Sequence, residues 1–167
     1  MVKLRTFELK KVDIKRDFGL INNLSKNRGV CDYISRDFYG FIMEHLANRD
    51  DVIEPGGSYV VYKDGIDIGI IGSKLLSDDG ILELWCAIKS DLRNKSYGSK
   101  LLWEITIYLI ENIKGLEDIE LKINKQNFPS IQVALNNGFV YRNEDKTNGL
   151  NIYRYFNNND DSNTKTR

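Results

Sequence analysis

Apolar and polar positions follow two different periods along this chain, and the changes between them predict its elements. Alternating or short apolar runs, typical of strands, cover residues 4–9, 58–63, 67–76, 81–88, 117–124, 139–142 and 150–156. Apolar residues at helical spacing cover residues 17–26, 32–48, 97–113 and 129–136. Strands and helices in this order predict a mixed α/β layer with one main sheet.

Short turn signals place three of these strands side by side. Asp64-Gly65 stands between two apolar runs, and such a dipeptide favours a two-residue hairpin. The polar run at residues 78–80 turns the chain again into residues 81–88. We therefore expect an antiparallel meander of three strands. Gly115 and Gly138 follow predicted helices and are expected to end them.

Length and composition limit the function classes. The chain has 167 residues, 41% hydrophobic and 29% charged, which is typical of one soluble globular domain. We assign that domain to residues 1–156 and expect the polar stretch 157–167 to be a disordered tail. Lys+Arg and Asp+Glu both number 24, so the net charge is zero, which disfavours a general nucleic-acid binder.

The sequence predicts no metal site, secretion signal or membrane span. Cys31, Cys86 and the single histidine, His45, lack metal-ligand spacing, so two buried free thiols in a reducing compartment are expected. Charged residues from Lys3 onward interrupt any apolar run near the start, and no apolar stretch reaches bilayer length. These features predict a cytoplasmic protein that works without metal or membrane.

Residues 82–100, LELWCAIKSDLRNKSYGSK, carry the strongest chemical signal. An apolar strand ends in a polar loop that holds Arg93 and Lys95, passes Gly98 and enters an amphipathic helix. The first amides of a helix lack partners within it, and the helix dipole places roughly +0.5 charge at that end. The arrangement predicts a site for an anion such as a pyrophosphate. A solvated surface loop is the alternative interpretation.

The same loop resembles a motif of the GNAT superfamily of N-acetyltransferases. Residues 93–98 (RNKSYG) are similar to the family's Arg/Gln-x-x-Gly-x-Gly/Ala motif. Residues 127–130 (NFPS) resemble its Asn-x-x-Ser element, and residues 137–139 (NGF) resemble its terminal Gly-Phe. The resemblance covers most of residues 4–156. It implies a central, mostly antiparallel sheet of about seven strands flanked by about four helices.

The resemblance also implies a cofactor, acetyl-CoA, and a way to bind it. Family members pass the acetyl group directly to a primary amine, without a covalent intermediate. The strand before the loop splays from the next strand, and the pantetheine arm pairs with strand backbone in that cleft. The cofactor-binding positions that follow are Cys86, Ala87, Ile88, Arg93, Asn94, Lys95, Ser96, Tyr97, Gly98, Ser99, Asn127 and Ser130.

Two positions depart from the family pattern. Ser96 replaces the first loop glycine, and serine in a left-handed conformation costs about 1–2 kcal/mol, which would weaken cofactor binding by roughly tenfold. Ala134 stands where many family members carry a tyrosine that protonates the leaving thiolate. Water or another tyrosine, such as Tyr141 or Tyr153, would have to supply that proton.

The resemblance suggests Glu83 and Asn127 as catalytic residues. Some family members place a general base on the strand before the loop, where Glu83 lies, but the most similar pattern puts that glutamate at Leu82. One residue of offset turns a side chain to the other face of a sheet, unless a β-bulge corrects it. Glu120 on the next strand is the alternative base. Asn127 is expected to contact the pantetheine arm, to cap the following helix, or both.

The acceptor stays open among a small amine, an antibiotic amine and a protein amino group. Residues 130–139 are similar to the ribosomal-protein N-terminal acetyltransferase branch. Family members often dimerise through their last strands, so a homodimer is a candidate assembly. The alternative function is a non-catalytic acyl-CoA-binding module or sensor, which Ser96, Ala134 and the offset glutamate favour. A P-loop or dinucleotide-binding enzyme is disfavoured because the loop lacks both glycine motifs.

Overall fold

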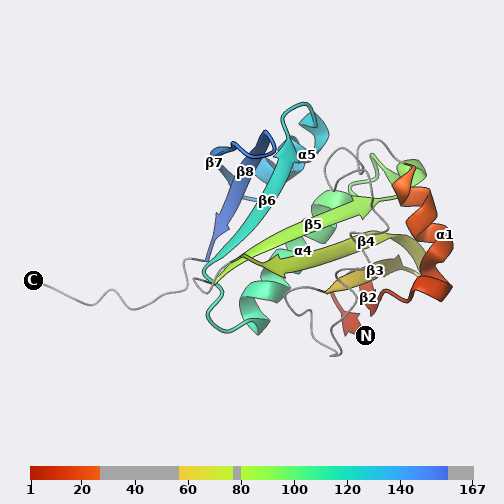
Figure 1. Cartoon of the computed structure of the whole chain (residues 1–167). Coiled ribbons are helices and arrows are strands. Elements are labelled where there is room, and N and C mark those ends of the chain that lie inside the picture. Colours follow the sequence, from red (N-terminus) through yellow and green to blue (C-terminus); the bar gives the residue numbers. More distant parts are fainter. Residues whose placement is uncertain (27–56, 77–79, 158–167) are drawn as a thin grey trace, which may run out of the picture.

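One mixed sheet with helices on both faces forms the molecule (Figure 1). The computed structural model describes residues 1–26, 57–76 and 80–157. The strands lie in the order β1-β2-β3-β4-β5-β6-β8-β7, and every pairing is antiparallel except that of β5 with β6. Their bounds are β1 Val2–Lys3, β2 Glu8–Lys11, β3 Ser58–Lys63, β4 Ile66–Leu75, β5 Ile81–Ile88, β6 Asp118–Asn124, β7 Val140–Asp145 and β8 Leu150–Phe156.

The helices divide the core into two parts. One face of the sheet packs against α4 (Tyr97–Asn112) and α5 (Phe128–Asn136), and the other packs against α1 (Ile14–Ser25). A single turn of 3₁₀ helix, η1 (Ser90–Leu92), connects β5 to the loop before α4. Along β5, Leu82 and Leu84 belong to the core under α4, whereas Trp85 and Ala87 belong to the core under α1. The two faces of β5 therefore serve different halves of the molecule.

Most predicted elements are confirmed. The strands predicted at residues 58–63, 81–88 and 150–156 have those bounds, and the three-strand meander is present. The hairpin between β3 and β4 turns at Asp64 and Gly65, whose φ angles of 52° and 79° suit a two-residue turn. The predicted helix 32–48 lies outside the described residues, as do His45 and Cys31.

Several predicted boundaries differ from those of the structure, and three of these differences are informative. Residues 4–7, predicted as part of a strand over residues 4–9, instead form a turn between β1 and β2, closed by Leu4 N donating to Phe7 O. The eight strands of the described residues agree with the predicted sheet of about seven. The first helix begins at Ile14, before the predicted residue 17, because Asp13 Oδ1 caps it by accepting from the amides of Lys15 and Arg16. Asn157, assigned to the tail, is fixed to the fold: its side chain donates to Leu116 O at 2.8 Å.

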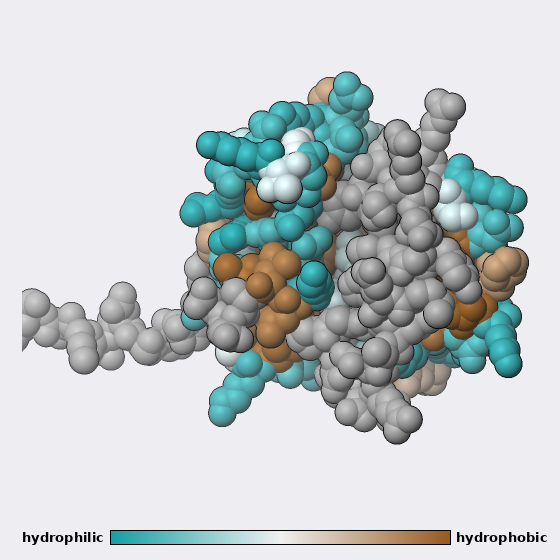
Figure 2. All heavy atoms as spheres, viewed as in Figure 1, coloured by the Kyte–Doolittle hydropathy of each residue, from teal (hydrophilic) through white to brown (hydrophobic). Residues whose placement is uncertain are grey.

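The described surface is ordinary for a globular protein. Among the coloured residues of Figure 2, hydrophilic side chains predominate and apolar ones gather in smaller patches between them. Among the described helices, none is both long and apolar enough to cross a membrane.

Candidate functional site

The two neighbours of β5 pair with it to different extents. β4 pairs along residues 82–88, but β6 pairs only along residues 81–83. Beyond Glu83, β5 continues to Ile88 and β6 continues to Asn124 without pairing with each other, and Figure 1 shows β6 and β8 turning away from β5. We call this opening the fork. It is the splayed arrangement that the family resemblance predicts.

The loop after β5 leaves helix amides without partners. Asn94 and Ser96 adopt left-handed conformations, with φ of 60° and 61°. Ser96 occupies the cap position of α4 but makes no side-chain capping bond, because capping residues have extended backbone. The amides of the first turn of α4 are therefore left for an outside acceptor. Left-handed residues running into a right-handed helix also form a concave anion-binding nest.

The charge and space around this loop suit an anion. Arg93 and Lys95 are exposed, and the first turn of α4 has no acidic residue. Among the described residues, a Cβ added at Gly98 would meet only Ile88 Cγ1, at 4.0 Å, so these residues leave space at the helix start, which adjoins the end of β5. The structure thus brings predicted residues 93–99 together at the end of the strand that forms one side of the fork.

Cys86 lies on the stretch of β5 that borders the fork. The expectation of a buried thiol is wrong for this residue, because β6 turns away before it and the side chain is exposed. Surrounding protein nevertheless desolvates the thiol and raises its pKa to about 11. With so high a pKa, the thiol is a poor nucleophile at neutral pH.

Glu83 lies at the last pair before the fork opens, with 18% of its side chain exposed. β5 follows β4 without a register shift, so no β-bulge corrects the offset: Leu82 is buried under α4 and Glu83 is on the opposite face. Lys122 Nζ lies 3.2 Å from Glu83 Oε2, and this ion pair crosses the opening between β5 and β6. We did not predict Lys122 from the sequence, although its two-residue spacing from Glu120 places both on one face of β6.

Glu120 is opposite Glu83 in the register but is already engaged. Its side chain is 3% exposed, and Arg154 donates to Glu120 Oε2 from both Nε and Nη2 at 2.8 Å. Arg154 Nη1 also lies 3.5 Å from Asp118 Oδ2. The Glu120 carboxylate is therefore buried and bound by the Arg154 guanidinium. Glu83, which water reaches, is the better placed of the two to exchange a proton.

Asn127 caps α5, as one of its two expected roles requires. Its Oδ1 accepts from the amide of Ser130 at 3.3 Å. Within the described part of the chain, Asn127 Nδ2 donates to no acceptor, so it remains available to a ligand. Ala134, further along α5, is fully buried in the core and offers no acid.

Two candidate tyrosines lie far from β5 in the sheet. Tyr153 is on β8 and Tyr141 on β7, so β6 separates both from β5. Their rings meet edge to face, with 5.8 Å between centroids, and Tyr153 is 4% exposed. They pack against each other, and Tyr153 lies in the same core as Ala134.

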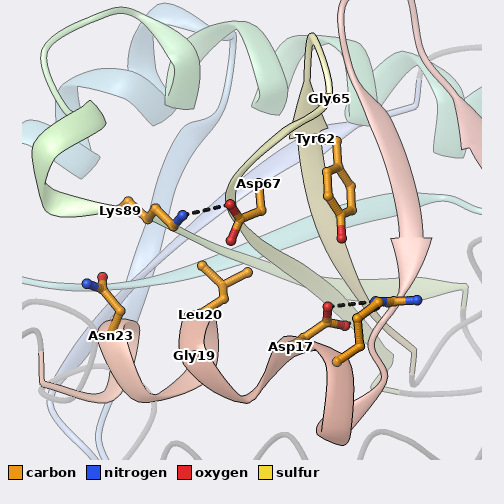
Figure 3. A pocket seen from close by; sticks show the side chains of 9 residues that line it. Asp17, Gly19, Leu20, Asn23, Tyr62, Gly65, Asp67 and Lys89 are labelled. Atoms are coloured by element: carbon orange, nitrogen blue, oxygen red, sulfur yellow. Dashed lines mark hydrogen bonds and ion pairs between the residues drawn. The ribbon is translucent and has the colours of Figure 1, made fainter.

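A separate hollow of 420 Å³ opens between α1 and the β3–β4 turn (Figure 3). Lys89 Nζ pairs with Asp67 Oδ1 at 2.8 Å on one side of it, and Arg16 Nη2 pairs with Asp17 Oδ2 at 2.7 Å on the other. Burial raises the pKa of Tyr62, whose side chain points into the hollow. Because its charged side chains are paired with each other, the hollow offers no free charge to a ligand.

No group of three or more His, Cys, Asp or Glu side chains suited to a metal occurs in residues 1–26, 57–76 and 80–157.

Comparisons with known proteins agree with this geometry. Residues 27–139 match the model of the Acetyltransferase (GNAT) family. A search of curated proteins found no match.

Solved structures share the fold. An acetyltransferase from Agrobacterium tumefaciens has a TM-score of 0.76 at 16% identity, over 93% of this chain and 94% of that one. Spermidine N-acetyltransferase from Vibrio cholerae, in complex with CoA and spermine, has a TM-score of 0.67 at 19% identity, over 89% and 93%. The ribosomal L7/L12 α-N-protein acetyltransferase RimL, in complex with CoA, has a TM-score of 0.70 at 14% identity, over 91% and 94%.

Proposed function

Because the chain belongs to the acetyltransferase (GNAT) family, we propose that it transfers an acetyl group from acetyl-CoA to a primary amine by direct attack on the thioester. The observation that carries this proposal is the fork beside the uncapped start of α4. Acetyl-CoA has a polyanionic end and a narrow arm with amide groups. The loop suits the first, and the unpaired edge of β5 suits the second.

Each part of the cofactor has a matching part of the chain. The amides of the first turn of α4, with Arg93 and Lys95, bind the pyrophosphate. The pantetheine arm adds to the edge of β5 along residues 86–88, as an extended peptide adds to a sheet. Asn127 Nδ2 donates to the arm while Asn127 Oδ1 continues to cap α5. The unpaired stretch of β5 that carries Cys86 is the path that the arm takes.

The chemistry needs few groups. The amine nitrogen attacks the thioester carbon, so a C–N bond forms and the C–S bond breaks. Holding the two reactants together lowers the activation barrier by roughly 7–11 kcal/mol. A backbone amide of β5 stabilises the developing oxyanion. Glu83 accepts a proton from the attacking nitrogen, and water protonates the thiolate because Ala134 carries no acid.

The acceptor is proposed only as a primary amine. The two neighbours whose names give an acceptor act on a polyamine and on a protein α-amino group, so the fold serves both kinds. Zero net charge favours neither an acidic nor a basic acceptor.

Thermal unfolding with acetyl-CoA, desulfo-CoA or ATP tests the cofactor first. A ligand bound only by the native state adds about 2.7 kcal/mol at a hundred times its Kd. We expect both CoA compounds, but not ATP, to raise the Tm. No shift at millimolar acetyl-CoA would contradict the proposal.

Thiol release with spermidine, an aminoglycoside and an N-terminal peptide as acceptors tests transfer. We expect release that depends on one of these amines and that falls by about a hundredfold or more in Glu83→Gln, with the acetyl-CoA shift intact. Glu144→Gln is the matched control, because Glu144 is exposed and pairs with Lys125. If the chain bound acetyl-CoA but released no thiol with any of these amines, the result would instead support the non-catalytic acyl-CoA-binding module.

A further inference from the structure

Asn137 joins the two helices on either side of the fork. It follows α5, which packs on β6, and it reaches Ser99 in the first turn of α4, which packs on β5. Asn137 Nδ2 donates to Ser99 Oγ at 3.0 Å and to Val133 O at 2.8 Å. Only 7% of Asn137 is exposed, so water competes little for these bonds.

The direction of the bond to Ser99 is fixed. Val133 O can only accept, so the atom of Asn137 that faces it must be the amide nitrogen. The reversed side chain would place two acceptors against each other. The same nitrogen faces Ser99 Oγ, and the serine oxygen is therefore the acceptor in that bond.

This direction leaves the hydrogen of Ser99 free. A serine hydroxyl donates one hydrogen bond and can accept two. Within the described part of the chain, no acceptor takes the hydrogen of Ser99 Oγ. Ser99 lies in the turn of α4 whose amides are also unpaired, so the hydroxyl joins a set of donors that lacks an acceptor.

We propose that Asn137 is a positioning residue for the cofactor: it holds Ser99 so that the hydroxyl donates to a phosphoryl oxygen of CoA. The inference rests on the proposed function, since it requires CoA at this loop. Hydrogen bonds in a chain strengthen one another, so donation by Asn137 makes the Ser99 hydroxyl a stronger donor. Asn137 also ties the loop side of the fork to the α5 side.

A double-mutant cycle on CoA binding, measured by isothermal titration calorimetry, tests the proposal. We expect Ser99→Ala to raise the Kd for CoA by about tenfold, as for a hydrogen bond to a charged group, and Asn137→Ala to raise it by about fivefold. In the Ser99→Ala background, Asn137→Ala should have no further effect, because it acts through that hydroxyl.

Asn137→Asp is a sharper test, because it changes the hydrogen bonding of the side chain with almost no change in its size. The carboxylate accepts from Ser99 Oγ and turns its hydrogen away from the phosphate, so we expect a larger rise in Kd than for Asn137→Ala. Asn136→Ala is the matched control: the neighbouring amide bonds Gln132 on the surface, and its loss should leave the Kd unchanged. The Tm of each variant without ligand separates folding effects from binding effects.

The outcomes separate this inference from the proposed function. If the wild-type chain binds no CoA, the proposed function and this inference are both overturned. If it binds CoA and the effects of Ser99→Ala and Asn137→Ala multiply, Asn137 acts on the fold in general and the inference alone is overturned. A drop in Tm for Asn137→Ala with an unchanged Kd would also overturn it.

Discussion

β5 has a closed edge, which pairs with β4, and an open edge, which borders the fork. A glycine beside each edge has a different effect. On the closed edge, a Cβ at Gly69 of β4 would collide with the carbonyl oxygen of Ala87. On the open side, a Cβ at Gly98 would meet only Ile88 among the residues that the structure describes, at 4.0 Å. The missing side chain at Gly69 lets β4 and β5 approach each other. At Gly98 it leaves space beside Ile88 that no described residue fills. The comparison supports the proposal that the open side binds a ligand.

Backbone hydrogen bonding leads to the same conclusion. Along the closed edge, residues 82–88 of β5 pair with β4. Along the open edge, the ladder with β6 ends at Glu83, although both strands continue. Backbone groups without a strand partner need water or a ligand. An edge left open at the centre of a sheet is therefore a site in which a ligand backbone can replace a strand.

The largest effect is expected from filling the open side. Gly98→Trp places an indole over the start of α4, where the anion would bind. We expect CoA affinity to fall by about a thousandfold, or about 4 kcal/mol, while the Tm without ligand changes by only a few degrees. Calorimetry and thermal unfolding measure the two. A variant that binds CoA normally would show that the cofactor lies elsewhere.

The closed edge should give the reverse pattern. Gly69→Ala forces the backbones of β4 and β5 apart, and such overpacking costs about 1–3 kcal/mol. We expect a lower free energy of unfolding in urea. Because the collision falls at Ala87, in the stretch proposed to pair with the arm, the Kd for CoA should rise too, but by about tenfold at most, or about 1.4 kcal/mol, far less than in Gly98→Trp. If CoA binding failed while stability held, the two edges would not be separate in function.

The sequence predicted the elements better than the site. Alternation placed β3, β5 and β8 correctly because each is a short apolar run between turn residues, and the helix start after the basic loop was correct for the same local reason. The prediction of the fork came from family resemblance. The point at which the pairing between two distant strands ends depends on how they approach in space, which the local sequence does not show. No local pattern gave the pairing of Lys122 with Glu83 or of Asn137 with Ser99, whose partners are 39 and 38 residues apart.

The burial of Cys86 was mispredicted for a related reason. A cysteine inside an apolar strand is usually buried, and the exposure here follows from the departure of β6, which the local sequence does not encode. Glu120 shows the opposite case. It alternates like an exposed strand residue, yet Arg154, 34 residues later, buries and binds it.

The open edge also predicts how Cys86 reacts. In Cys31→Ser, the thiolate fraction of Cys86 follows its pKa of about 11, so alkylation by iodoacetamide should rise about tenfold per pH unit from pH 7 to pH 10. Mass spectrometry measures the rate. Bound CoA should slow it, because the arm is proposed to lie along this stretch of β5. A rate that levels off near about pH 8.5, the value of a free thiol, would mean that the side chain stands in open water.

The smallest effect is expected from relieving backbone strain. The loop on the open side contains strained residues, and the paired residues of β4 and β5 do not. Ser96 is left-handed with φ of 61°, and its hydroxyl makes no capping bond to compensate. Ser96→Gly removes a penalty of about 1–2 kcal/mol but frees the unfolded chain by about 0.5–1 kcal/mol, so we expect a net gain of roughly 0.5–1 kcal/mol in urea unfolding. Ser96→Ala should bring no gain, since alanine keeps the strain. Asn94→Gly should gain less, because asparagine tolerates the left-handed region better than serine. Equal gains at both positions would show that glycine relaxes the whole loop and that the strain does not belong to Ser96.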